Sequence, residues 1–357
     1  MQKYLFLASI LLGFAACKRD PYLNTGQKAY KDTQFTNYFK RTTGWVAGDG
    51  AYSTPLSNGQ SLWAFGDCYI NNYDAATQSV PCIFDARSSL FVMDINNPAS
   101  INTLPGNQGS NSYFLPADGN NWTWPGPGFQ SGDTIYVFVN KLSQANTDTP
   151  AAARIALPGY NFSSYYNIPH ARGINFACSV IPDTTYTYIY GTRNNGFGND
   201  LFVARFAANN IYAPWQYYGN AGWSADTNAI TKIWDEFTAS FYVVKIETEY
   251  ILITTEFSVD CNQGKNIYVA TAPTPAGPFT NQHSIWQVDD TISGDWPFFY
   301  LANAHPEFDN GHKELLITYC INGYGSCFNS CLNGRMDPDI YRPRAIRVPY
   351  KAIEPSL

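Results

Sequence analysis

Two aspartates near the start of the chain have the spacing expected of a catalytic carboxyl pair. Asp49 stands in the run "AGDGAY" and Asp67 in "FGDCY", and the alternating apolar residues around Asn58-Gly59 predict a hairpin that pairs these two runs. If the register places Asp49 opposite Asp67, their Cβ atoms lie about 5 Å apart. A tight two-residue turn would shift the register by one residue and put the acids on opposite faces. Two carboxyls at this short distance cannot both ionise easily, so the pKa of one of them should rise. The acid and the nucleophile of a retaining glycosidase are such a pair.

Polar and aromatic residues at the starts of later strand-rich segments could complete such a site. The candidates are Glu236 as a third catalytic acid, Asn175 and His305 as polar wall residues, and Trp122, Trp124 and Trp223 as platforms for sugar rings. Each type also has a structural interpretation. Asp and Gly are common in ordinary turns, Glu236 can be a solvated loop charge, His305 can be a packed core histidine, and most tryptophans pack in a core.

The composition defines the kind of fold that must position these residues. Of 357 residues, 45% are hydrophobic, 16% are aromatic and only 14% are charged. Such a chain can bury a large core, which excludes a disordered protein, and its net charge of −6 argues against a nucleic-acid partner. Many Tyr, Phe, Thr, Val and Ile residues between Gly- and Pro-containing turns predict an all-β protein.

Strand-rich units recur along the chain about every 64 residues, which suits four-stranded propeller blades with long loops. The units begin near Trp45, Trp124, Gly173, Glu236 and Ala302. We therefore expect a five-bladed β-propeller of four-stranded antiparallel blades, with a closing strand from residues 341–350. A double-sheet sandwich is the structural alternative, but it does not explain the spacing.

The amino terminus has the pattern of an export signal. Residues 1–16 combine Lys3 with a short apolar run and end in small residues before Cys17, as in a bacterial lipobox. We expect a signal peptide over 1–16, a tether lipidated at Cys17 over 17–43, and one propeller domain over 44–357. The membrane contact would be the lipid anchor alone, on either face of the outer membrane. Ordinary secretion is the alternative.

If the protein is exported to an oxidising compartment, the remaining cysteines are expected to form disulfides rather than to bind metal. Cys68 with Cys82, and a pair among Cys320, Cys327 and Cys331, are the expected bridges. Seven cysteines remain after Cys17, so at least one thiol should stay free. No Cys-x-x-Cys motif occurs, and no metal site is expected from the cysteines and histidines.

The first hairpin resembles the opening of a bacterial family of five-bladed propellers. The run "WVAGDGAYSTPLSNGQSLWAFGDCYI", and later "YIYGT", "DLFVARF" and "YRPRAIRVP", look like motifs of the domain-of-unknown-function 4185 group, which includes endo-D-arabinanases. The resemblance implies a glycoside hydrolase whose catalytic pair is Asp49 and Asp67. Two departures put the substrate in doubt: Pro127 stands where relatives often carry an acid, and residues 320–339 form a cysteine-rich insertion.

These observations together predict a monomeric glycoside hydrolase that acts on a furanose-rich polysaccharide such as arabinan. Glu236 would orient the acids or the sugar. No organic cofactor is expected, and the resemblance is compatible with a structural calcium ion at the channel. The alternatives are a non-catalytic glycan-binding lipoprotein of a polysaccharide-uptake system and a scaffold or adhesion protein.

Overall fold

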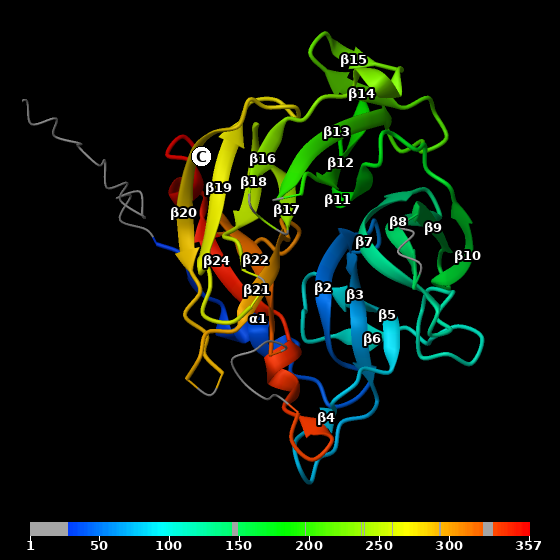
Figure 1. The fold of residues 1–357 in the computed structure, drawn as a ribbon, viewed down its shortest axis with the longest axis vertical. Coiled ribbons are helices and arrows are strands. Elements are labelled where there is room, and N and C mark those ends of the chain that lie inside the picture. Colours follow the sequence, from blue (N-terminus) through cyan, green and yellow to red (C-terminus); the bar gives the residue numbers. More distant parts are fainter. Residues whose placement is uncertain are drawn as a thin grey trace, which may run out of the picture.

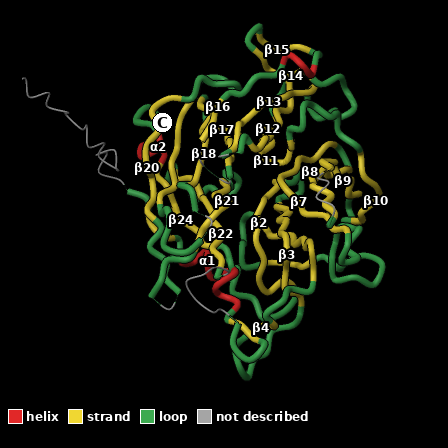
Figure 2. The backbone as a smooth tube through the Cα atoms, viewed as in Figure 1, coloured by secondary structure: helices red, strands yellow, loops and turns green. Residues whose placement is uncertain are grey.

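The computed structural model describes residues 28–357 except 145–148, 197, 237, 239, 259, 293 and 324–330. The expected signal peptide, Cys17 and Cys327 lie outside the described residues. Within the described part of the chain, no helix is long and apolar enough to cross a membrane. Figure 2 shows strands throughout, with helices confined to short segments.

Five antiparallel sheets follow one another along the chain and form the blades of a propeller, as predicted (Figure 1). Blade 1 is β2 (Trp45–Pro55), β3 (Gln60–Ile70), β5 (Ala86–Asp94) and β6 (Ile101–Thr103). Blade 2 is β7 (Asn121–Ser131), β8 (Thr134–Ser143), β9 (Thr149–Ala156) and β10 (Asn161–Tyr166). Blade 3 is β11 (Asn175–Pro182), β12 (Tyr186–Asn194), β13 (Asn199–Ala207) and β14 (Gln216–Gly219), extended by β15 (Gly222–Ser224) and β16 (Trp234–Glu236).

Blade 4 is β17 (Phe241–Ile246), β18 (Glu249–Thr255), β19 (Asn266–Ala272) and β20 (Thr280–Gln287). Blade 5 is β21 (Phe298–Ala304), β22 (Glu314–Asn322), β24 (Arg344–Pro349) and β1 (Tyr30–Lys31). The first strands of the five blades, β2, β7, β11, β17 and β21, contact one another in that order and close back on β2. They therefore surround the axis of the ring and line its centre.

Apolar layers between adjacent blades hold the ring together. Residues of β18 show how one strand serves two layers: Ile251 and Ile253 pack toward blade 5, while Tyr250 and Leu252 pack toward blade 3. Successive side chains of a strand point to opposite faces of its sheet, and both faces of a blade are covered. Such strands therefore appear in the sequence as continuous apolar runs rather than as alternating ones.

Residues before the expected domain boundary at position 44 take part in the ring. Strand β1 pairs with β24, and α1 (Thr33–Tyr38) packs Phe35 against Trp63 and Phe308 between blades 5 and 1. Strand β24 lies within the segment predicted to close the ring, and it is the third strand of blade 5, with β1 outside it. The last helix, α2 (Tyr350–Ile353), and two 3-10 helices, η1 (Thr227–Ala229) and η2 (Pro338–Tyr341), complete the described elements.

The cysteine pairing differs from both predicted bridges. A disulfide joins Cys82 to Cys331, which are 249 residues apart in sequence. It lies beside the small sheet of β4 (Val80–Pro81) and β23 (Arg335–Met336), whose pairing brings the two loops together. Cys261 is also disulfide-bonded. Cys68, predicted to pair with Cys82, is a free thiol buried in the layer between blades 5 and 1, and Cys320 is also free and buried.

Candidate active site

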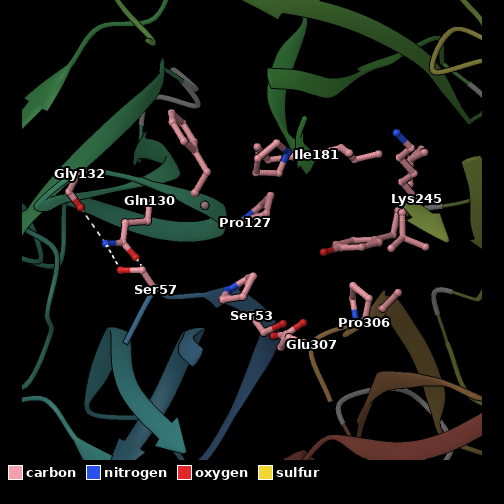
Figure 3. A pocket seen from close by; sticks show the side chains of 18 residues that line it. Ser53, Ser57, Pro127, Gln130, Gly132, Ile181, Lys245, Pro306 and Glu307 are labelled. Atoms are coloured by element: carbon pink, nitrogen blue, oxygen red, sulfur yellow. Dashed lines mark hydrogen bonds between the residues drawn. The ribbon is translucent and has the colours of Figure 1, made fainter. Parts of the chain in front are cut away.

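The centre of the ring holds a cavity at each end. A cavity of about 430 Å³ lies where the inner strands begin, and its wall includes Asp49, Trp124, Asn175 and Tyr300 from four blades. A second cavity, of about 660 Å³, lies where the same strands end (Figure 3). Because the five inner strands run in the same direction around the axis, their first residues meet at one end although they are far apart in sequence.

The register of the first hairpin differs by one residue from the predicted one at the acids. Near the turn the pairing is as predicted, with Ser53 opposite Trp63, but bulges farther along place Asp49 opposite Gly66 instead of Asp67. Ala51 and Asp67 have positive φ angles of 48° and 40°, which mark the two irregular positions. A Cβ atom at Gly66 would lie 3.0 Å from Oδ1 of Asp49 and 3.4 Å from Cδ1 of Trp124. The absence of a side chain at position 66 therefore leaves room for Asp49 next to the Trp124 ring.

Asp49 is a mostly buried carboxyl in the wall of the first cavity. Its Oδ2 accepts a hydrogen bond of 2.8 Å from the Tyr300 hydroxyl, and Tyr341 also hydrogen-bonds to it. Burial, followed by the charge of Asp67, raises the pKa of Asp49 to about 7, although both tyrosines favour its ionised form. Asp49 can therefore hold and release a proton near neutral pH.

Asp67 has a different environment, with a cation and an indole N–H directed at one oxygen. Its Oδ1 accepts hydrogen bonds from Nε1 of Trp124 at 3.0 Å and from Nη1 of Arg87 at 3.2 Å. Burial raises the pKa of Asp67, while Trp124 and Arg87 oppose that rise. The Arg87 guanidinium is itself held between the rings of Phe84 and Trp122, 4.7 Å from each ring centroid. The pair thus combines a carboxyl that retains its proton with a carboxylate that is stabilised by an arginine.

The second cavity has one carboxyl, Glu307, and one ammonium group, Lys245, among the described residues of its wall. Its wall is largely apolar, with four prolines, and Figure 3 shows Glu307 beside Ser53 and away from Lys245. Glu307 accepts a hydrogen bond of 2.8 Å from Ser61, and burial raises its pKa. Asp49 lines the first cavity, and Asp67 lies next to it through its hydrogen bond to Trp124, so the carboxyl pair is at the end where the inner strands begin.

Three of the predicted wall residues lie at or next to this cavity. Trp124 and Asn175 line it. Trp122 is packed edge-on against Trp124, with ring centroids 6.0 Å apart, and its own ring covers Arg87. The structure therefore brings Asp49, Asp67, Trp122, Trp124 and Asn175 together from blades 1, 2 and 3.

Three other predicted site residues lie elsewhere. His305 is fully buried: it stacks on Trp63 and hydrogen-bonds to Ser53 and Thr318, so its packed-core interpretation is correct. Trp223 lies on β15 at the outer side of blade 3, where its ring packs on Tyr218 and on Arg205.

Glu236 ends β16, which pairs with the outer side of β13 as β14 does, and it accepts hydrogen bonds from Gln282 and from Trp234. Glu236 is absent from the described residues that line the first cavity. It sits beside the outer strand of blade 4 because β16 pairs with β13, the third strand of blade 3, rather than with an inner strand.

Three residues that contact the acids were not predicted from the sequence. Tyr300 and Tyr341 bond to Asp49, and Arg87 pairs with Asp67. Tyr341 opens the quoted run "YRPRAIRVP", and Tyr300 lies on the inner strand of the fifth unit. Their positions in the repeat were the only features of the sequence that could have indicated a place near the acids. Among the residues with described positions, no group of three or more His, Cys, Asp or Glu side chains could hold a metal ion.

Comparison with solved structures shows the same fold in other proteins. A candidate hydrolase from Bacteroides ovatus has a TM-score of 0.72 at 20% sequence identity, with 90% of each chain covered. An exo-1,5-alpha-L-arabinanase from a bovine ruminal metagenomic library has a TM-score of 0.51 at 10% identity, covering 85% of this chain and 93% of that one.

A β-xylosidase/α-arabinofuranosidase of glycoside hydrolase family 43, from a compost microbial metagenome and in complex with xylotriose, has a TM-score of 0.50. It is 12% identical, and 86% of this chain and 91% of that chain are covered. At these identities the likeness establishes the propeller fold. None of the curated protein sequences matches this chain.

The sequence matches one family model over residues 32–350, under the description domain of unknown function 5005. This match does not confirm the resemblance to the domain-of-unknown-function 4185 group. It covers the ring from α1 to the start of α2, including both aspartates of the first blade. The chain therefore belongs to the domain-of-unknown-function 5005 family, and its fold is a five-bladed β-propeller.

Proposed function

We propose that this protein is a glycoside hydrolase that cleaves a neutral, furanose-rich polysaccharide such as arabinan, with Asp49 and Asp67 as its catalytic pair. The observation that carries the proposal is the contrast between the two carboxyls. Asp49 is buried beside two tyrosines with a pKa near 7, and Asp67 is paired with Arg87. Carboxyls whose environments separate their pKa values are suited to the roles of acid and nucleophile.

The roles follow from the environments. Protonated Asp49 donates its proton to the glycosidic oxygen as the bond from that oxygen to the anomeric carbon breaks. The Asp67 carboxylate attacks the anomeric carbon and forms a glycosyl ester. Asp49, now ionised, then takes a proton from water, whose oxygen displaces Asp67 from the anomeric carbon and restores both groups. The resulting mechanism retains the anomeric configuration.

The neighbouring residues and the structural relatives support a sugar as substrate. Trp124 provides an aromatic surface beside Asp67, and Asn175 provides an amide across the cavity. Aromatic rings with a few placed polar groups are typical of ligand pockets. The solved structures of similar fold include an exo-1,5-alpha-L-arabinanase and a β-xylosidase/α-arabinofuranosidase in complex with xylotriose.

The test is release of reducing sugar from a panel of arabinans, xylans and galactans. We expect Asp49→Asn and Asp67→Asn each to lower turnover at least 1,000-fold, an order of magnitude typical for removal of an essential catalytic group. Glu307→Gln is the matched control, because it removes a buried carboxyl from the opposite cavity, and it should retain turnover. Unchanged turnover in Asp49→Asn would refute the catalytic role proposed for Asp49, and no release of sugar from any polymer by the unsubstituted protein would refute the hydrolase. Sugar binding without turnover in the unsubstituted protein would favour a glycan-binding lipoprotein.

We further propose that the protein acts outside the cytoplasm, anchored through lipid on Cys17. The lipobox-like leader and the disulfide-bonded cysteines support an oxidising compartment. Labelled palmitate should be incorporated by the expressed protein and not by its Cys17→Ser variant. Equal labelling of the two would overturn this location.

A further inference from the structure

Exposed apolar side chains gather on the face where the inner strands begin, here called the Asp49 face. Strands in each blade alternate in direction, so connections between second and third strands, and those between blades, emerge on this face. Seven large apolar side chains are exposed among the described residues, and five of them belong to this face: Ile83, Trp124, Phe257, Trp296 and Leu332. Exposed aromatic side chains on the face that carries the cavity are available to a ligand that extends out of it.

We propose that Trp296 and Phe257 form a second sugar-binding platform, on which a neutral polysaccharide chain rests as it extends from the cavity at Trp124. The inference rests on the proposed function and adds that the ligand is an extended polymer. Trp296 is 39% exposed and Phe257 is 46% exposed. They lie on the connection from β20 to β21 and on the loop from β18 to β19, on the side of the ring away from Trp124 in blade 2.

Hydrogen bonds between the two loops hold the backbone of Trp296 in place, and a lysine lies over its ring. The backbone N–H of Asn262 donates to the Trp296 carbonyl oxygen at 2.9 Å, and the backbone N–H of Trp296 donates to Oδ1 of Asn262 at 3.0 Å. The Asn262 amide also donates to Asp295 at 3.0 Å. The Lys265 ammonium lies 2.8 Å from the ring centroid. A loop whose backbone is already fixed loses little conformational freedom when a ligand binds, which favours affinity.

Aromatic contacts connect this platform to the acids. Phe298, two residues after Trp296, stacks on Tyr300 with ring centroids 5.2 Å apart, and Tyr300 donates its hydroxyl hydrogen to Asp49. The N–H of Phe299 also donates to Ser258 of the β18–β19 loop at 3.3 Å. The platform is therefore structurally continuous with the wall of the catalytic cavity.

The chemistry of a sugar chain fits this surface. The C–H faces of sugar rings are weakly apolar and pack against aromatic rings, whose amphipathic character suits partly hydrated contacts. A neutral chain is favoured over a polyanion because the protein carries a net charge of −6 and the cavity holds two acids. The opposite face has one exposed aromatic residue among those described, Tyr212, on the β13–β14 loop.

The experiment measures binding without hydrolysis. In the Asp49→Asn background, affinity for soluble linear arabinan, xylan and galactan is measured by affinity electrophoresis. We expect Trp296→Ala to weaken binding to the preferred polymer at least tenfold, and Trp296→Phe to restore most of it. Tyr212→Ala, which removes an aromatic ring that is 52% exposed on the opposite face, should bind as the parent does. Melting temperatures establish that each variant is folded.

The outcomes separate this inference from the proposed function. The platform proposal would be overturned if the Asp49→Asn protein binds equally well with and without Trp296→Ala. It would also be overturned if the Asp49→Asn protein binds no polymer of the panel. Full hydrolytic activity in Asp49→Asn would overturn the assigned catalytic role, while a loss of binding in Trp296→Ala would still support the platform.

Discussion

The indole nitrogen of Trp124 in blade 2 donates a hydrogen bond of 3.0 Å to the carboxylate of Asp67 in blade 1. The same indole is 37% exposed and forms part of the cavity wall. One side chain can therefore contact a bound ligand and orient the carboxylate that we propose as the nucleophile. This contact depends on the packing of adjacent blades, and it links substrate position to the ionisation of Asp67.

Arg87 should set the acidic limit of activity. Replacing it with Met removes the positive charge that opposes the rise in the pKa of Asp67, so that pKa should increase further. Since Asp67 must be ionised to attack, the acidic limb of the profile of kcat/KM against pH should move to higher pH by a similar amount.

Arg205 provides a matched control for Arg87. Its guanidinium is also held between two rings, 3.8 Å from Tyr186 and 4.2 Å from Trp223, but in the outer part of blade 3. Arg205→Met should leave the profile in place. If Arg87→Met lowers activity at every pH without moving the acidic limb, Arg87 does not act through the ionisation of Asp67.

Tyr300 should influence the alkaline limit. Its hydrogen bond favours the ionised form of Asp49, so Tyr300→Phe should raise the pKa of Asp49 above its present value of about 7. Asp49 then keeps its proton to higher pH, and the alkaline limb of the profile should shift upward, by about 0.5 to 1 unit for the loss of one hydrogen bond. A downward shift would contradict the assignment of Asp49 as the proton donor.

Asp49 should reduce the stability of the fold at neutral and alkaline pH. Its pKa is 3.8 in the unfolded chain and about 7 when folded, so the folded protein binds this proton more tightly. The free energy of unfolding therefore falls as the pH rises from about 4 to about 7, by roughly 4 kcal/mol in total for this group. Asp49→Asn removes the ionisable group, so this pH-dependent loss of stability should disappear.

Urea denaturation at two pH values tests this expectation. Compared with the unsubstituted protein, Asp49→Asn should gain about 2 to 3 kcal/mol more stability at pH 8 than at pH 5. The comparison needs no substrate, so it examines the environment of Asp49 independently of the hydrolase proposal. An equal difference between the two proteins at both pH values would show that Asp49 is not held protonated by burial.

The Cys82–Cys331 disulfide should stabilise the ring by joining loops of the first and last blades. Its removal in Cys82→Ser/Cys331→Ser should lower the free energy of unfolding by about 2–4 kcal/mol, because the unfolded chain loses a long-range crosslink. The measurement is denaturant unfolding without reductant. A double variant as stable as the parent would show that the paired strands β4 and β23 hold these loops without the crosslink.

Local patterns in the sequence were sufficient to predict the architecture and the first hairpin, which carries Asp49 and Asp67. Apolar runs bounded by turns indicated the blades, because a strand buried on both faces leaves a continuous signal in a short window. The Asn58-Gly59 turn indicated the first hairpin, and the pairing of Ser53 with Trp63 is as predicted. The bulge that places Asp49 opposite Gly66 was not visible, because a bulge depends on how the strand must bend toward the ring axis.

The sequence by itself therefore determined a β-propeller with two acids at the start of its first blade. Only the tertiary structure decided which distant groups meet those acids, namely Tyr300 and Arg87, and which candidates are excluded, namely His305 and Trp223. It also paired Cys82 with Cys331 across 249 residues. The reason is physical: strand and turn preferences act between near neighbours, whereas contacts around a ring arise from the packing of whole blades.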